Sequence, residues 1–267
     1  MFERPLAIRC ENVSKCFRRD DADPYVGLRA KLNDAFKPSS KRPEAADGGV
    51  VWALRDVSFA IPAGGVVGVL GANGSGKSVL LRILARVTKP DAGRAEVHGS
   101  TGSILHLGGM LLPEMTGEET IYQLGTILRA PRQTIAQRFD EIVDFAGIRP
   151  HLKSLVRGYS AGMHVRLAFA VMVYLDADVL LLDEALSVAD QDFRRRCLER
   201  IREMAAQGRT IVLVSHELDM MAEVCDHALV LESGRLRMCG DAATVIAEYR
   251  RSAGGAMAPA GRSGAER

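Results

Sequence analysis

The sequence lacks any apolar run long enough to cross a membrane. A membrane-spanning helix needs about 18 consecutive apolar residues or more, and the longest candidate, residues 167–175, is much shorter. The N-terminal residues also lack the apolar core of a signal peptide, because charge begins at Glu3. We therefore expect a soluble protein, which could still dock onto a membrane protein.

Cysteine is scarce, and its spacing fits neither a zinc site nor a disulfide framework. The count is odd and no CxxC pair occurs, which favours reduced thiols. The cysteines are Cys10, Cys16, Cys197, Cys225 and Cys239.

Neither sign of charge dominates, and aromatic residues are few. The chain has 35 basic and 33 acidic residues, so no surface for a polyanion is indicated and we expect no nucleic-acid partner. A hydrophobic content of 47% with only 5% aromatic residues is typical of an aliphatic α/β core. We find no internal repeat.

Strand-like and helix-like segments alternate along the chain, which predicts an α/β fold with a parallel central sheet. We expect an edge strand at 6–17 and further strands at 52–61, 66–70, 178–184 and 209–217, with a hairpin at 227–236. We expect helices at 78–87, 118–128, 135–146 and 190–206, of which the middle two suggest a helical subdomain inserted into the core.

Two segments fall outside this pattern. Residues 18–49 form a polar, proline-containing insert that reads as a loop. A short amphipathic helix within it is an equal alternative, because Tyr25, Leu28, Leu32 and Phe36 fall at helical spacing. Residues 251–267 are small and polar, and we expect a disordered tail.

The octapeptide GANGSGKS, residues 71–78, matches the phosphate-binding pattern G-x-x-x-x-G-K-[ST] in full. It follows an apolar strand and opens a helix, so a glycine-rich turn that binds nothing is disfavoured. In such loops backbone N–H groups hold the phosphates, the lysine reaches the β- and γ-phosphates, and the last hydroxyl binds Mg²⁺. The predicted ATP-binding residues are Gly71, Ala72, Asn73, Gly74, Ser75, Gly76, Lys77, Ser78 and Val79, with Lys77 also catalytic and Ser78 also a metal ligand.

Polar side chains end two other apolar strands. Asp183 and Glu184 stand where ligands bind in parallel sheets, and we expect Asp183 in the metal shell and Glu184 as the base that activates water. A helix cap is the lesser alternative. His216 ends another strand, where its imidazole can donate to a γ-phosphate oxygen. A lone histidine is more often structural, but the strand-end position favours a functional role.

A second turn, Ser160 to Gly162, heads an apolar helix, and we cannot bring it back to the same ATP within one compact chain. If two copies meet head to tail, Ser160 and Gly162 of one copy face the γ-phosphate held by the other. The hydroxyl, the backbone N–H groups and the helix N-terminus would then stabilise charge across the interface. The sequence thus predicts a homodimer with ATP between the chains.

In order, GANGSGKS, YSAGM, LLLDE, SVAD and VSHE resemble the Walker A, signature, Walker B, D-loop and H-loop motifs of an ABC-transporter ATPase subunit. The resemblance implies one ABC ATPase domain, residues 1–250, with a P-loop NTPase core, an antiparallel β subdomain and a helical subdomain at about 112–172. It also implies ATP and Mg²⁺ as cofactors, and a role for Asp190 in coupling the two sites of the dimer.

A narrower resemblance concerns the exported cargo. YSAGMHVRLAFAVM and LHLGGMLLPEMTGEETIY are similar to segments of the ATPases that energise export of lipid-linked polysaccharide, O-antigen, capsule or teichoic acid. This resemblance implies an integral-membrane permease subunit as partner, a place at the cytoplasmic face of the bacterial inner membrane, and contact with the permease near residues 107–118.

The sequence departs from the family pattern at three places. Ala161 replaces the usual glycine or serine, so the backbone there must avoid a positive φ. His106 stands at the Q-loop position and is our weaker candidate for the metal shell. The aromatic ring that stacks on adenine is Phe17 or Trp52; we favour Phe17, although either ring fits a core position.

Two other functions remain as alternatives. The chain could serve an exporter of lipids or drugs, or it could be a soluble ABC ATPase outside transport. Soluble ABC ATPases outside transport generally carry two cassettes or long coiled-coil insertions, which disfavours the second alternative.

Overall fold

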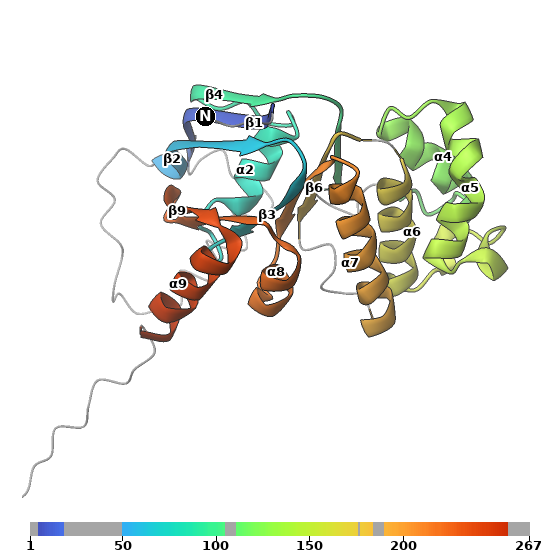
Figure 1. The fold of residues 1–267 in the computed structure, drawn as a ribbon. Helices are drawn as coiled ribbons and strands as arrows, with labels where there is room; N and C mark the ends of the chain where they lie inside the picture. The colour runs from blue at the N-terminus through green and yellow to red at the C-terminus, as the bar shows by residue number, and fades with distance from the viewer. Residues whose placement is uncertain (1–4, 19–49, 105–110, 176, 184–189, 256–267) are drawn as a thin grey trace, which may run out of the picture.

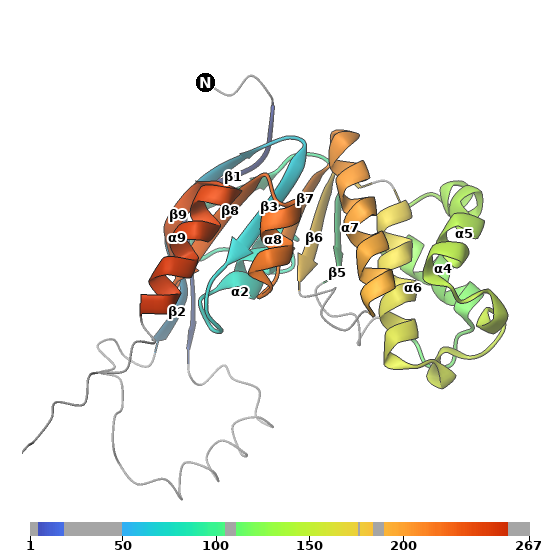
Figure 2. The same ribbon diagram turned by 60° about the horizontal axis from the view of Figure 1, so that its bottom comes forward.

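A six-stranded sheet runs through the middle of the molecule, with an antiparallel sheet on one side and helices on the other (Figures 1 and 2). The computed structural model describes residues 5–18, 50–104, 111–175, 177–183 and 190–255. The strands are β1 (Leu6–Arg18), β2 (Val50–Pro62), β3 (Gly65–Leu70), β4 (Ala92–Val97), β5 (Thr101–Ile104), β6 (Val179–Asp183), β7 (Thr210–Val214), β8 (His227–Glu232) and β9 (Arg235–Asp241). The helices are α2 (Lys77–Leu84), α4 (Gly117–Ile127), α5 (Arg132–Ala146), α6 (Ala161–Tyr174), α7 (Gln191–Ala206), α8 (Leu218–Val224) and α9 (Ala242–Gly255), with 3-10 turns η2 (Arg149–His151) and η3 (Val156–Gly158).

The central sheet has the order β5-β6-β7-β3-β8-β9, and every neighbouring pair is parallel except β8 and β9. Its four inner strands, β6, β7, β3 and β8, are almost wholly apolar because both faces are covered. In β6, Leu180 and Leu182 join the core under the helices, whereas Val179 and Leu181 join the core around α2 and the antiparallel sheet. The predicted α/β fold with a mostly parallel central sheet and an antiparallel β subdomain is confirmed.

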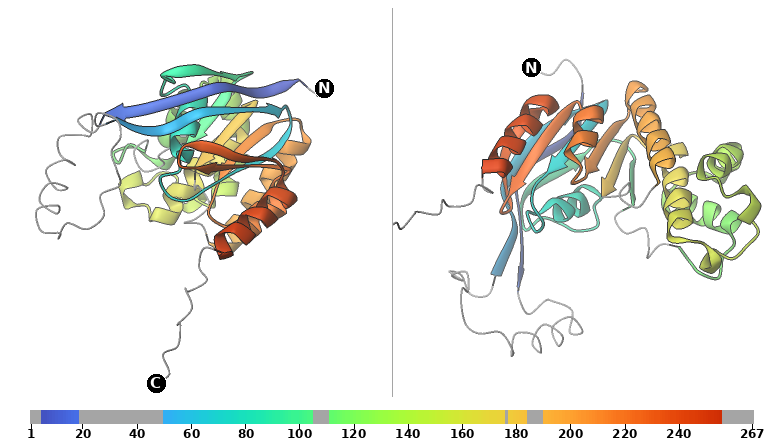
Figure 3. Two further views of the ribbon diagram at one scale, coloured as in Figure 1. Left: turned by 90° about the vertical axis from the view of Figure 1, so that its left-hand side faces the viewer. Right: turned by 90° about the horizontal axis from the view of Figure 1, so that it is seen from below.

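The antiparallel sheet has the order β2-β1-β4, so β1 lies in its centre. The prediction of an edge strand at residues 6–17 is therefore wrong. The reason is that alternation of apolar and polar residues shows which face of a strand is buried, and it carries no information on how many neighbours the strand has. β1 and β2 run side by side as a long ribbon along this layer (Figure 3).

Helices α4, α5 and α6 pack together beside the sheet (Figure 2). A capping box begins α4: the Thr116 hydroxyl accepts from the Glu119 N–H at 3.2 Å, and the Glu119 carboxylate accepts from the Thr116 N–H at 2.8 Å. These bonds from Thr116, first the backbone and then the hydroxyl, hold the pKa of Glu119 below its usual value.

An aromatic cluster joins this group of helices to α7. Phe193 on α7 meets Phe145 on α5 edge-on at 5.4 Å between centroids and Phe169 on α6 at 6.1 Å. Phe169 and Phe193 are both fully buried. Aromatic pairs in such edge-to-face arrangements add stability beyond the burial of their area.

The chain ends differ in part from expectation. The prediction of a disordered tail is wrong for residues 251–255, because α9 continues as regular helix to Gly255. Its small residues had concealed the end of the helix, and residues 256–267 lie outside the described part of the chain. Of the polar insert, Arg18 belongs to β1, and residues 19–49 with their alternative helix also lie outside it.

All five cysteines are free, as predicted. Burial raises the pKa of the Cys10 and Cys225 thiols to about 12, so both stay protonated at neutral pH. Among the described residues, no helix is both long and apolar enough to cross a membrane.

We predict that Phe193→Ala lowers the free energy of unfolding by about 3–5 kcal/mol, because it opens a cavity where α5, α6 and α7 meet. Chemical denaturation measures this loss. The matched control is Ile127→Ala on α4, whose side chain is 47% exposed and whose loss should stay within about 0.5 kcal/mol. Equal losses in the two variants would contradict the assignment of the cluster to the core.

Candidate functional site

The phosphate-binding loop connects the end of β3 to the start of α2. It needs glycine at both ends, since Gly71 has φ 145° and Gly76 has φ 106°. A Cβ on Gly71 would collide with the Leu231 carbonyl oxygen, and one on Gly76 with that of Ala53. At Gly74, φ is 79° and no atom lies within 4 Å of the Cβ position, so this side of the loop is open to a ligand.

Lys77 is buried inside this loop. Its ammonium group donates to the carbonyl oxygens of Gly71 at 2.7 Å and Ala72 at 3.0 Å. A buried ammonium needs such partners. These bonds hold the positive charge within the loop, at the N-terminus of α2, where anionic oxygens bind best.

Asp183 ends β6 at the same edge of the sheet. Val214 of β7 pairs with Val69 of β3 on one side and with Asp183 on the other, which places Asp183 level with the end of β3. Strand alternation directs Asp183 to the face of Val179 and Leu181, which is the face covered by α2. The structure thus brings Asp183 to the side of the sheet that carries the phosphate loop.

His216 lies two residues beyond the end of β7 at this edge and is exposed. Its neighbour Glu217 is fixed twice: its N–H donates to the Ser215 hydroxyl at 3.1 Å, and its carboxylate pairs with Arg194 of α7. Sequence reasoning missed Arg194, because nothing in the pattern of α7 distinguishes it from the adjacent arginines.

The second turn lies apart from this edge. Ser160 caps α6, accepting from the Met163 N–H at 3.2 Å, and α6 packs on α4, α5 and α7 away from α2 (Figures 1 and 2). Ala161 is the first residue of the helix and is not among the residues with positive φ, as its Cβ requires. The structure therefore does not join Ser160 and Gly162 to the phosphate loop of their own chain.

Asp190 caps α7, and its carboxylate accepts from the Phe193 N–H at 2.9 Å and pairs with Arg166 of α6. The N–H of Phe193 and then the Arg166 guanidinium hold the pKa of Asp190 below its usual value, so the carboxylate is charged at neutral pH. Arg166 lies in the RLAF segment that follows the signature turn, and sequence reasoning had given it no role.

Phe17 and Trp52 lie on neighbouring strands and point to opposite faces of the ribbon. Trp52 pairs with Cys16, and Phe17 is the next residue along β1. Their exposed fractions are 41% and 39%, so neither ring is part of the core.

Phe17 shares its face with Lys15, whose ammonium lies 5.5 Å from the ring centroid. Lys15 pairs with Leu54, and Leu54 is the side chain that a Cβ on Gly76 would meet at 2.8 Å. Phe17 is therefore on the face of the ribbon that turns to the phosphate loop, and Trp52 is on the other.

Two predicted site residues, Glu184 and His106, lie outside the described part of the chain. Within that part, no group of three or more histidine, cysteine, aspartate or glutamate side chains is gathered for a metal. The remaining predicted ligands are the exposed Ser78 in the first turn of α2 and Asp183 at the end of β6.

We predict that Gly71→Ala weakens ATP binding more than about tenfold. The new Cβ would collide with the Leu231 carbonyl of β8, and alanine is strained at the positive φ of residue 71, so the loop must shift. Equilibrium binding of a fluorescent ATP analogue measures the affinity. Gly208→Ala is the control: φ is 89° there, but no atom lies within 4 Å of the new Cβ, so ATP binding should be unchanged. Wild-type affinity in Gly71→Ala would show that the loop does not depend on this packing.

Known proteins are similar to this chain in sequence, and others are similar to it in fold. The ABC transporter family model matches residues 54–187. The O-antigen export system ATP-binding protein RfbB of Myxococcus xanthus is 37% identical over 91% of this chain and 55% of its own length. RfbB of Klebsiella pneumoniae is 38% identical over 75% of this chain and 81% of its own. The teichoic acids export ATP-binding protein TagH of Bacillus cereus is 36% identical over 91% and 42%.

The chain thus spans about half the length of the Myxococcus and Bacillus relatives. Among solved structures, a dimeric ATP-binding cassette in a post-hydrolysis state with ADP and Pi superposes with a TM-score of 0.68 at 18% identity, covering 88% of this chain and 98% of its own. The ordered motifs and the fold agree with these relatives, and the chain belongs to the ABC transporter family of ATP-binding proteins.

Proposed function

We propose that this protein hydrolyses ATP as the nucleotide-binding subunit of a bacterial exporter for a lipid-linked polysaccharide of the O-antigen, capsule or teichoic-acid type. The observation that carries the ATPase part is the gathering of Lys77, Asp183 and His216 at one edge of a parallel sheet. The cargo class is supported by the relatives, whose names share the export of surface glycans.

ATP binds with its phosphates on residues 71–78 and its adenine against the β1–β2 ribbon. The loop supplies backbone N–H groups and the Lys77 charge to the phosphates. Phe17 is the better candidate to stack on adenine, because it lies on the loop-facing side of the ribbon and its ring is accessible.

The residues present fit a Mg²⁺ ion. Mg²⁺ prefers oxygen ligands and usually takes one or two carboxylates together with substrate phosphates, and Ser78 and Asp183 would provide the protein oxygens. When bound, the ion neutralises charge on the β- and γ-phosphate oxygens. His106 has no support beyond its place in the sequence and stays the weaker candidate.

The chemistry of hydrolysis is assigned to Glu184 and His216. Glu184 follows Asp183 directly and accepts the proton of the attacking water. His216 donates to a γ-phosphate oxygen, and the Arg194–Glu217 ion pair fixes the backbone beside it. Lys77 stabilises the developing charge on the phosphate oxygens.

The site is completed by a second copy of the chain. Among the described residues nothing requires Gly162 to be glycine: its φ is not positive, and a Cβ would meet only the Ser160 hydroxyl at 3.9 Å. A close approach from outside explains the missing side chain. We propose that this approach is the γ-phosphate held by the partner, and the dimeric state of the solved relative supports it. Asp190, held by Arg166 at the end of α6, links the signature helix to α7.

A membrane permease is the second partner, which places the protein at the cytoplasmic face of the inner membrane. The export-system names of the relatives support this assignment. The proposed docking segment, residues 107–118, is described from residue 111 onward, and there Leu112 is 47% exposed beside Pro113. An exposed leucine beside a proline suits contact with a partner helix.

We predict that Glu184→Gln binds ATP with wild-type affinity and hydrolyses it at least about a hundredfold more slowly, because the base is lost while the phosphate loop is intact. Phosphate release measures turnover. Glu199→Gln on the exposed surface of α7 is the control and should keep the wild-type rate. Wild-type turnover in Glu184→Gln would remove Glu184 from the mechanism.

We predict that cells carrying Lys77→Ala as their only copy lose the surface polysaccharide and accumulate its lipid-linked form inside. Extraction of lipid-linked glycans from the cytoplasmic membrane measures the accumulation. Normal surface glycan together with sensitivity to a drug or a defect in membrane lipid would contradict the cargo class and favour another exporter.

A further inference from the structure

The turn between β8 and β9 lies directly against the phosphate loop. The N–H of Gly234 donates to the Ser75 carbonyl at 3.1 Å, and the Gly234 carbonyl accepts from the Arg55 N–H at 2.8 Å. One residue of this turn is thus bonded on one side to the loop that holds the phosphates, and on the other to the β1–β2 ribbon.

The three segments meet backbone to backbone. A Cβ on Gly234 would lie 2.9 Å from the Ala53 carbonyl oxygen and 3.3 Å from the Leu54 Cα. The Ala53 oxygen also occupies the Cβ position of Gly76. No side chain fits between the turn and β2, and the atoms nearest to a Cβ at position 234 all belong to β2, so that Cβ would press on the ribbon rather than on the loop.

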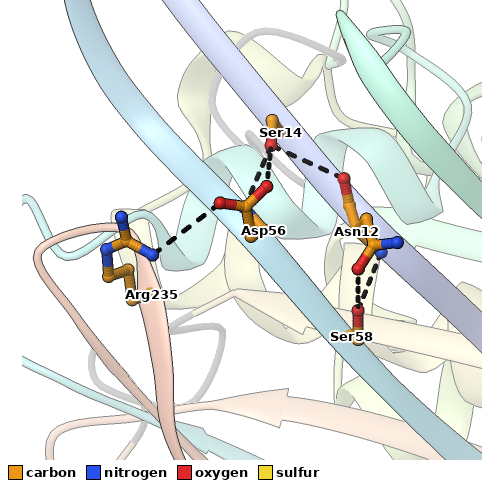
Figure 4. A network of polar contacts seen from close by, with 5 residues as sticks. All are labelled: Asn12, Ser14, Asp56, Ser58 and Arg235. Atoms are coloured by element: carbon orange, nitrogen blue, oxygen red, sulfur yellow. Dashed lines mark hydrogen bonds and ion pairs between the residues drawn. The ribbon is translucent and has the colours of Figure 1, made fainter.

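The ribbon is fixed at this same level by a polar network (Figure 4). Asn12 and Asp56 both have positive φ, 49° and 53°, where the pairing register of β1 and β2 shifts. The Ser14 hydroxyl accepts from the Asp56 N–H at 2.9 Å, and Arg235, next to Gly234, lies 3.8 Å from the Asp56 carboxylate. The bend in the ribbon and the hairpin are therefore tied together at one point.

We propose that Gly234 is a positioning residue that sets the β1–β2 ribbon, with its adenine-facing ring, at a fixed distance from the phosphate loop. This inference rests on the proposed function, because it takes Phe17 as the ring that stacks on adenine. ATP touches both elements, and a ligand that has only the phosphates touches one. Comparing the affinities for the two ligands therefore distinguishes a shifted ribbon, which weakens ATP alone, from a damaged loop, which weakens both.

The tight turn alone would not require glycine at position 234. Ser233 and Gly234 have φ of 48° and 77°, which suits a two-residue hairpin turn of the type that also accepts asparagine. Asparagine at position 234 would keep the turn, but its Cβ would press on the Ala53 carbonyl. Ser233 is exposed, so asparagine there keeps the turn without that contact.

The test measures the affinity of Gly234→Asn and of the matched control Ser233→Asn for ATP and for inorganic tripolyphosphate, both with Mg²⁺. We expect Gly234→Asn to weaken ATP about five- to tenfold, the scale of losing a base–aromatic stack, and to change tripolyphosphate by less than about twofold. Ser233→Asn should match the wild type for both ligands. Equal weakening of both ligands, or no change in either, would overturn the proposal.

A second pair of variants covers the case in which Gly234→Asn does not fold. Arg235→Gln removes the ion pair with Asp56, and Arg237→Gln removes a similar exposed pair with Glu232 on the same hairpin. We expect a loss of about twofold, confined to ATP, in Arg235→Gln alone, since exposed ion pairs contribute little. The same loss in both variants would overturn the proposal.

Phe17→Ala in the same assay separates this inference from the proposed function. Weaker ATP binding in Phe17→Ala with wild-type binding in Gly234→Asn would overturn the positioning role and leave the adenine assignment intact. Wild-type ATP binding in Phe17→Ala would overturn both.

Discussion

Close packing of backbone against backbone around residues 71–78 is the constraint on which the nucleotide site depends. Carbonyl oxygens of Leu231 and Ala53 stand where side chains of Gly71 and Gly76 would be. This packing keeps the loop curled, and the curl directs its own carbonyls at Lys77. A cation is thereby held at the N-terminus of α2, where the helix dipole and the first N–H groups already favour an anion.

The parallel sheet positions the other residues that one chain contributes to the nucleotide site. Because β3, β6 and β7 run in the same direction, their carboxyl ends meet at one edge, and this brings Asp183 and His216 to the loop although they are far apart in sequence. The signature turn is carried by α6, which the aromatic cluster around Phe193 fastens to α5 and α7 instead. The same packing that stabilises the helices thus keeps Ser160 away from the phosphate loop of its own chain, and we propose that a second copy brings its Ser160 to that loop.

Local patterns in the sequence were sufficient for much of this architecture. The phosphate loop, the buried strands and the strand-end Asp183 follow from motifs and alternation over a few residues. Features that depend on distant neighbours could not be read in this way. The central place of β1 requires knowledge of its pairing with β4. The contact of Gly234 with Ser75 joins segments at opposite ends of the chain, and the partners of Arg166 and Arg194 emerge only when α6, α7 and the segment after β7 are placed together.

Mixing two inactive variants tests most directly whether each site is shared by two chains. Lys77→Ala damages the phosphate loop, and Ser160→Arg damages the signature turn. The ATPase rate is measured for each variant alone and for an equal mixture. A shared site predicts that the mixture regains activity, because one of the two sites in a mixed dimer combines an intact loop with an intact turn. A mixture no more active than the sum of its components would contradict the account.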